Sequence, residues 1–214
     1  MTRTNKFALR MLAGGLMGAL IGPGLAHLVM YFDLPIGGVS LSPGGVVLAA
    51  VGGLYTLMGL FVWVGVIWPA LGALVLNVAD EEDLRDRRSM LHGSAITCIA
   101  LGLAMMLLPF AGAGGPVRPG VALAALAGAL VITGGISWVA IKRKHYDELW
   151  MQLSADASAI TLAMLASLMV VWGALAHVGW GPELDPQLVF AAPPGLFLLA
   201  SFISAGRRGL LMEG

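Results

Sequence analysis

Six long apolar stretches divide the chain, and short polar segments separate them. Each stretch is long enough to cross the hydrocarbon core of a bilayer as a helix, which takes about 20 residues. The pattern predicts spans near residues 7–32, 46–78, 90–110, 121–141, 153–177 and 188–205. We therefore expect an all-α polytopic membrane protein, with six transmembrane helices in three hairpins that form one transmembrane domain over residues 1–214.

The positive charges alternate between the segments that flank these spans. Eleven of the twelve Lys and Arg residues lie before or in the first turn of the first span, between spans two and three, between spans four and five, or after the sixth, and only Arg118 lies on the other side. Basic residues stay on the cytoplasmic face of membrane proteins. The pattern predicts cytoplasmic N and C termini and an inner membrane of bacterial type, although a eukaryotic membrane is also compatible with it.

The first apolar stretch follows three basic residues, as it would in a secretory signal peptide, and Gly24-Leu25-Ala26 loosely resembles a cleavage site. Its apolar residues nevertheless continue to Phe32, which is too far for a signal peptide alone. We interpret the stretch as an uncleaved first span.

Composition agrees with a lipid environment. The chain is 58% apolar and 11% charged, whereas a soluble domain carries about 25% charged residues. Its net charge is zero, so we expect no nucleic-acid partner. The single cysteine, Cys98, excludes an internal disulfide and a cysteine-based metal cluster.

Small residues recur every four positions on three of the predicted spans. These faces consist of Gly14, Gly18 and Gly22; Ala124 and Gly128; and Ala155, Ala159, Ala163 and Ser167. Small side chains let helix backbones approach closely in lipid, where apolar helices gain no hydrophobic drive from association. We expect these faces to pack helices together within the chain, and the alternative is contact with a second copy or another membrane protein.

Proline and glycine interrupt two spans, at Gly22-Pro23-Gly24 and at Pro193-Pro194-Gly195. A last helix that started at Pro193 would reach only about 22 Å, short of the roughly 30 Å hydrocarbon core. Its outer part would then be bent, re-entrant or packed against protein. The interruptions indicate either two kinked helices or an outward-facing cavity between spans one and six. The second span has the opposite problem, because 46–78 would be about 50 Å long as one helix, and we expect a kink at Pro69.

Two hairpins show a weak internal repeat. Ser94-Ala95-Ile96-Thr97 recurs 64 residues later as Ser158-Ala159-Ile160-Thr161. Parallel repeats build several transporter folds. Chance similarity between apolar segments is the alternative interpretation.

Ionisable side chains within or near the bilayer are functional candidates by default. We select His27, His92, Asp156 and His177. Asp156 matches His92 under the 64-residue offset, so the two are expected to face each other with the carboxylate favouring the protonated imidazole; the alternative is that lipid headgroups and water solvate both. His27 and His177 lie near outer span ends, where two histidines can ligate haem or a metal. Because no third ligand has recognisable spacing and no Cys-x-x-Cys-His occurs, we predict neither a cofactor nor a metal.

Motifs of known enzymes are missing from the sequence. It contains no Gly-x-Ser-x-Gly, no His-Glu-x-x-His and no phosphate-binding glycine loop. We therefore expect no enzymatic activity and favour a structural, interaction or assembly component of the membrane. The alternative is a small-solute permease or channel with an outward-facing cavity between spans one and six.

Overall fold

The computed structural model describes residues 41–69, 72, 85–111, 115–142, 148–180 and 185–208. Every regular element in these ranges is helical: α2 (Pro43–Ile67), α5 (Arg88–Leu107), the 3-10 helix η1 (Leu108–Ala111), α6 (Pro119–Lys142), α7 (Glu148–His177) and α8 (Pro186–Arg207). Five of the helices described are long and apolar enough to cross a membrane. The all-helical class and the suitability for a bilayer are thus confirmed. Span 7–32 lies outside the described residues, so the six-span topology and the cytoplasmic termini stay predictions.

Two of the helices begin with the same capping arrangement, in which a polar N-cap residue is followed by proline. The Gly45 N–H donates to Ser42 Oγ at 3.0 Å, and Pro43 is the first residue of α2. The Gln187 N–H donates to Asp185 Oδ1 at 2.8 Å, and Pro186 is the first residue of α8. The cap oxygen satisfies a free backbone donor of the first turn, and proline has no N–H that needs a partner there.

The helix is interrupted inside the second predicted span, just before Pro69. Trp68 leaves the helical region with φ −113° and ψ 87°, because the ring of Pro69 disfavours a helical residue before it. α2 therefore has 25 residues and is about 37 Å long. Beyond the break, Pro69 and Gly72 are again helical, and the Gly72 N–H donates to the Trp68 carbonyl at 2.9 Å. The interruption lies where the sequence predicted a kink; positions 70, 71 and 73–78 lie outside the described residues, so the extent of this span to residue 78 stays a prediction.

The end of α7 agrees with the predicted boundary at His177. Gly179 has φ 74°, a left-handed conformation that glycine adopts without strain. It lets the Gly179 N–H reach the Ala176 carbonyl at 3.1 Å and the Trp180 N–H reach the Leu175 carbonyl at 2.9 Å. These two bonds satisfy carbonyls that the end of the helix would otherwise leave without donors.

The last predicted span, 188–205, corresponds to one continuous helix, α8, so the case of a helix that starts only at Pro193 does not apply. Both Pro193 and Pro194 lie inside α8, which has 22 residues and a length of about 33 Å. The prolines remove the bonds that positions 193 and 194 would donate to the carbonyls of Val189 and Phe190. The helix nevertheless begins upstream of them, because Asp185 caps it. No bent or re-entrant outer part is needed for it to cross the membrane.

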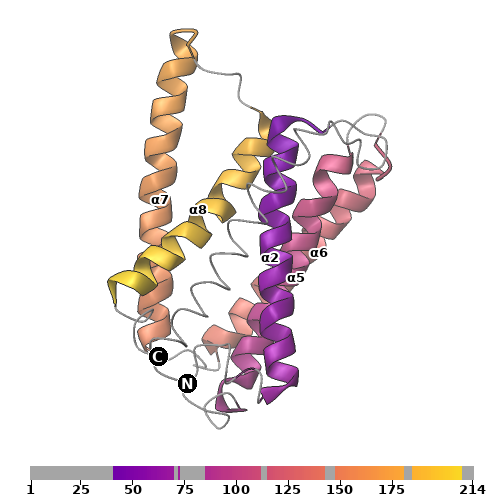
Figure 1. Cartoon of the computed structure of the whole chain (residues 1–214), viewed down its shortest axis with the longest axis vertical. Coiled ribbons are helices and arrows are strands. Elements are labelled where there is room, and N and C mark those ends of the chain that lie inside the picture. The colour runs from indigo at the N-terminus through magenta and orange to yellow at the C-terminus, as the bar shows by residue number, and fades with distance from the viewer. Residues whose placement is uncertain are drawn as a thin grey trace, which may run out of the picture. The chain divides into compact units, whose positions relative to one another are not determined.

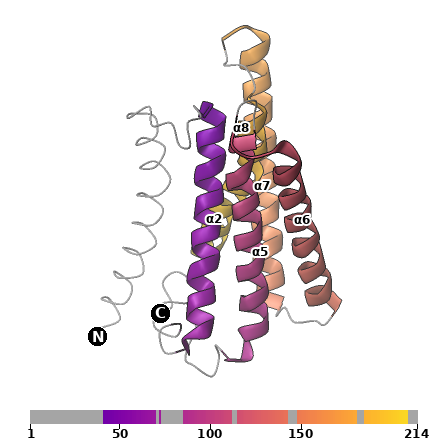
Figure 2. The same cartoon turned by 90° about the vertical axis from the view of Figure 1, so that its right-hand side faces the viewer.

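The chain divides into two compact units, with the boundary between His145 and Tyr146. In the first unit α5 lies between α2 and α6 and packs against both (Figures 1 and 2). The short η1 contacts all three of these helices. In the second unit α7 packs against α8. The single transmembrane domain over residues 1–214 stays a prediction.

Glycine brings α2 and α5 into backbone contact. A Cβ atom added to Gly52 would lie 2.7 Å from the Gly102 carbonyl oxygen, and one added to Gly59 would lie 2.8 Å from the Ala95 carbonyl oxygen. Such distances are too short for any side chain. Beside these glycines Ala95 is 1% exposed and Met105 is fully buried. The α2–α5 contact is therefore the most closely packed helix pair of the first unit.

The small-residue faces predicted from the sequence are not part of this contact between α2 and α5. On α7 the residues Ala155, Ala159, Ala163 and Ser167 are all exposed. On α6 both Ala124 and Gly128 are exposed, and a Cβ on Gly128 would meet no atom within 4 Å. The face Gly14, Gly18, Gly22 lies outside the described residues. Small residues do join helices in this chain, but the described contact uses glycines of α2 and α5 that do not repeat every four positions.

Replacing Gly102 with alanine tests this contact. The new Cβ would lie 2.5 Å from the Gly52 carbonyl oxygen, so α2 and α5 must separate. We expect Gly102→Ala to lower the free energy of unfolding in mixed detergent micelles by about 1–3 kcal/mol. Gly53→Ala is the matched control, because nothing lies within 4 Å of a Cβ at that position, and it should be neutral or raise stability by about 0.5–1 kcal/mol. Equal effects of the two substitutions would contradict the close contact.

Candidate functional site

Polar side chains of the described helices gather near helix ends. The first cluster joins the end of α2 to the start of α5, and the second joins the first half of α7 to the end of α8. Each cluster lies within one compact unit and has its own cavity. These two places are the candidate sites.

In the first cluster His92 of α5 contacts Trp63 of α2. The Trp63 indole Nε1–H donates to His92 Nε2 over 3.3 Å, and the ring centroids are 6.4 Å apart. Because Nε2 accepts this bond, the proton of the neutral imidazole belongs on Nδ1. Nδ1 is buried and has no hydrogen-bond partner among the described residues. The imidazole is thus held in one tautomer by its neighbour helix.

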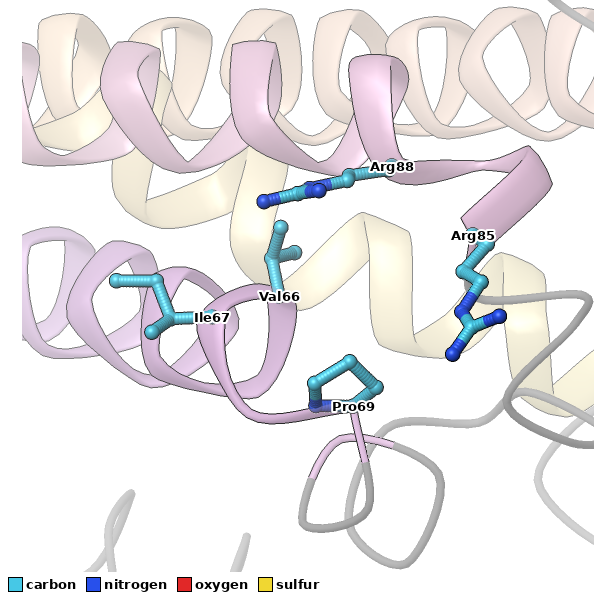
Figure 3. Close-up of a pocket in the computed structure, with 5 residues that line it drawn as sticks. All are labelled: Val66, Ile67, Pro69, Arg85 and Arg88. Atoms are coloured by element: carbon cyan, nitrogen blue, oxygen red, sulfur yellow. The ribbon is translucent and has the colours of Figure 1, made fainter.

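A cavity of about 250 Å³ lies at the same ends of α2 and α5. Its lining residues are Val66, Ile67, Pro69, Arg85 and Arg88. Figure 3 shows both arginine side chains pointing toward the end of α2, with Arg88 across Val66 and Ile67 and Arg85 toward Pro69. Among the described residues neither arginine has an ion-pair partner. The cavity therefore combines an apolar wall with two cations that have no ion-pair partner in the part of the chain that the structure describes.

The second cluster is built around Arg208, the residue that ends α8. Arg208 donates from Nε and Nη2 to Asp156 Oδ2 at 3.2 and 2.6 Å, and from Nη1 to Gln152 Oε1 at 3.0 Å. Asp156 and Gln152 lie one turn apart on α7, so one guanidinium reaches both. A cation at a helix C-terminus is also stabilised by the helix dipole. The cluster ties the end of α8 to α7.

The cavity beside this ion pair has a volume of about 420 Å³ and a buried hydroxyl in its wall. It is lined by Asp156, Ala159, Ile160, Ser204, Arg207 and Arg208. Ser204 is 2% exposed, and within the described ranges its Oγ has no hydrogen-bond partner. Buried hydroxyls are nearly always paired, so Ser204 is the unusual member of this cluster.

The residues selected from the sequence fall into separate surroundings. His92 contacts Trp63 in the first unit, and Asp156 pairs with Arg208 in the second. The pairing of His92 with Asp156 stays a prediction. His177 is exposed as the last residue of α7, and His27 lies outside the described residues. Within the described ranges no three His, Cys, Asp or Glu side chains are grouped to hold a metal ion.

Sequence reasoning missed the partners of these residues. Trp63 precedes His92 by 29 residues and Arg208 follows Asp156 by 52, and neither separation carries a motif. The one available signal was depth, because Arg208 and Asp156 are both predicted near the cytoplasmic ends of their spans. Depth in the membrane alone does not distinguish Arg208 from other basic residues near the cytoplasmic span ends as the partner of the Asp156 carboxylate.

Comparisons of the chain with protein-family models, with curated proteins and with solved structures find no match. No role or ligand is therefore carried over from a relative. The two polar clusters, their cavities and the helix faces are what indicates function.

A double-mutant cycle of Asp156→Asn and Arg208→Gln measures the ion pair. The Arg208 and Asp156 side chains are 30% and 49% exposed, so water screens part of their attraction. We expect a coupling free energy of about 0.2–1 kcal/mol in unfolding experiments in micelles. Strictly additive effects would mean that the pair contributes nothing.

The same measurement tests the pairing predicted from the sequence. A cycle of His92→Gln and Asp156→Asn should give a comparable coupling if the two side chains interact. Additive effects in this second cycle, together with coupling in the first, would rule out the His92–Asp156 pairing and leave Arg208 as the partner of the carboxylate.

Proposed function

We propose that this protein is a non-catalytic component of a bacterial-type inner membrane, with both termini cytoplasmic, that packs against partners or helps assemble a membrane complex. The observation that carries the proposal is the absence of Asp, Glu, Lys, Arg and His from the middle of all five described helices. Side chains of these types mark the solute, ion and proton paths of transport proteins. The described helices offer an apolar interior in place of such a path.

Hydroxyl groups within the helices do not supply a polar path either. Seven of them donate to the carbonyl four residues earlier on their own helix, namely those of Thr56, Ser94, Thr133, Ser158, Thr161, Ser167 and Ser201. A hydroxyl that is satisfied in this way needs neither water nor solute. This arrangement suits helices surrounded by lipid and by other helices.

The exposed small-residue face of α7 supports a role in packing. Ala155, Ala159, Ala163 and Ser167 leave a shallow strip along an apolar helix. Lipid covers large apolar side chains as well as protein does, so close association in a bilayer depends on small residues that admit another helix. The strip fits a helix of a second copy or of another membrane protein.

The alternative function is a small-solute permease or channel with an outward-facing cavity between spans one and six. The prediction of an outward-facing cavity used the interruption at Pro193-Pro194-Gly195, yet α8 is continuous through these residues. The other interruption, Gly22-Pro23-Gly24, lies outside the described residues. What still favours transport is the 64-residue repeat, which stays a prediction.

Water accessibility distinguishes the two functions. In a Cys98→Ser background, we expect single cysteines at Ala163 on α7 and Leu199 on α8 to resist water-soluble maleimides from both sides of the membrane. Cysteines at Trp180 and Arg207, near the helix ends, are the positive controls and should react. Reaction of the two central cysteines from both sides would favour the permease and contradict the packing role.

Cross-linking in native membranes tests the α7 face. In the same background Ala163→Cys should form a disulfide or a short-linker adduct with a second copy or another membrane protein. Leu168→Cys is the matched control, because it lies on the same helix, is 38% exposed and points about 140° away at 100° per residue. Equal cross-linking of both cysteines, or of neither, would argue against a specific interface on the small-residue face.

A further inference from the structure

We propose that the cavity between the end of α2 and the start of α5 binds a phosphate group, and that this phosphate belongs to an anionic phospholipid of the surrounding leaflet. The proposal rests on the cavity itself and on a membrane location. It does not depend on the packing role, and it would survive the loss of that role.

The positive charge of the cavity favours the binding of an anion. Arg85 and Arg88 both line it, and in the described part of the chain neither has a carboxylate partner. The negative end of the α2 dipole, equivalent to roughly half a charge, offsets only part of the two positive charges. A guanidinium presents donors in a fork that matches the oxygens of a phosphate. The neighbouring Arg87 and Asp86 do not line the cavity.

The size and the walls of the cavity suit a headgroup. Its volume of about 250 Å³ equals that of about eight water molecules in the liquid, which leaves space for a phosphate and part of its substituent. The wall opposite the arginines is apolar, formed by Val66 and Ile67. Ile67 is also 45% exposed, so the apolar surface continues outward from the cavity along α2. A lipid presents this combination of phosphate and hydrocarbon, whereas a free phosphate ion uses only the cationic wall.

Two tryptophans place the cavity at the depth of the headgroups. Trp68 ends α2 and is 62% exposed, and Trp63 lies about one turn earlier and is 39% exposed. Exposed tryptophans of membrane proteins concentrate at the interface between hydrocarbon and water. The cavity lies at this same end of α2. Anionic lipids attract basic residues at this level, and basic pockets between membrane helices are known to hold their headgroups.

Lipid selectivity of the full chain provides the test. The purified protein is placed in nanodiscs that contain phosphatidylglycerol and phosphatidylcholine in equal amounts, and the lipids that remain after mild delipidation are measured by native mass spectrometry. We expect retention of phosphatidylglycerol over phosphatidylcholine, and Arg85→Gln and Arg88→Gln should each lower the ratio about fivefold. Arg87→Gln is the matched control and should leave the ratio near that of the unchanged chain.

A second measurement separates a lipid from a soluble anion. Phosphatidylglycerol added to the protein in detergent should raise its melting temperature, while inorganic phosphate at the same concentration should not. An equal rise with inorganic phosphate would overturn the assignment to lipid. Unchanged lipid retention in both single variants, or the same loss in Arg87→Gln, would overturn the site itself. If a single variant does not fold, lysine replaces that arginine instead, because it keeps the positive charge but loses the forked donors of the guanidinium. Unchanged retention of phosphatidylglycerol over phosphatidylcholine in the lysine variant would overturn the guanidinium contact.

Discussion

The backbone contact between α2 and α5 is the constraint on which the rest of the first unit depends. Gly52, Gly59 and Gly102 allow an approach that no larger side chain permits. In lipid, two apolar helices have little reason to associate unless they can come this close. The contact places the end of α2 beside the start of α5, and the Trp63–His92 bond and the arginine cavity both lie at these ends.

The second unit is held in another way. There α7 packs against α8, Ala157 of α7 and Ala200 of α8 are buried, and the Arg208–Asp156 pair joins the two helices near one end. Such a partly exposed ion pair contributes little free energy but orients the groups it joins. The outward surface of α7 stays free for lipid or for another helix. The two units thus differ: α2 and α5 pack closely through glycine, whereas the small residues of α7 are exposed.

Most polar groups in both units are either near helix ends or hydrogen-bonded, as a bilayer requires. Charged residues stay near helix ends, and hydroxyls such as those of Thr56 and Thr161 bond to their own backbone, because unsatisfied polar groups in hydrocarbon are costly. Function is therefore expected at the membrane surface and along helix faces. The two exceptions in the described residues, the buried Nδ1 of His92 and Oγ of Ser204, both lie close to these helix ends.

The helical class, the ranges of α5, α6, α7 and α8 to within about five residues, and the small set of ionisable candidates could be predicted from the sequence, because the apolar run length that a bilayer demands is a local property. The sequence left open whether α8 runs through Pro193 and Pro194, since this depends on whether a cap such as Asp185 starts the helix upstream of them. Only the tertiary structure decided which glycines meet, which residues pair with His92 and Asp156, and that two arginines share one cavity. These contacts join residues far apart in the chain, and no periodicity along one helix specifies the face of another.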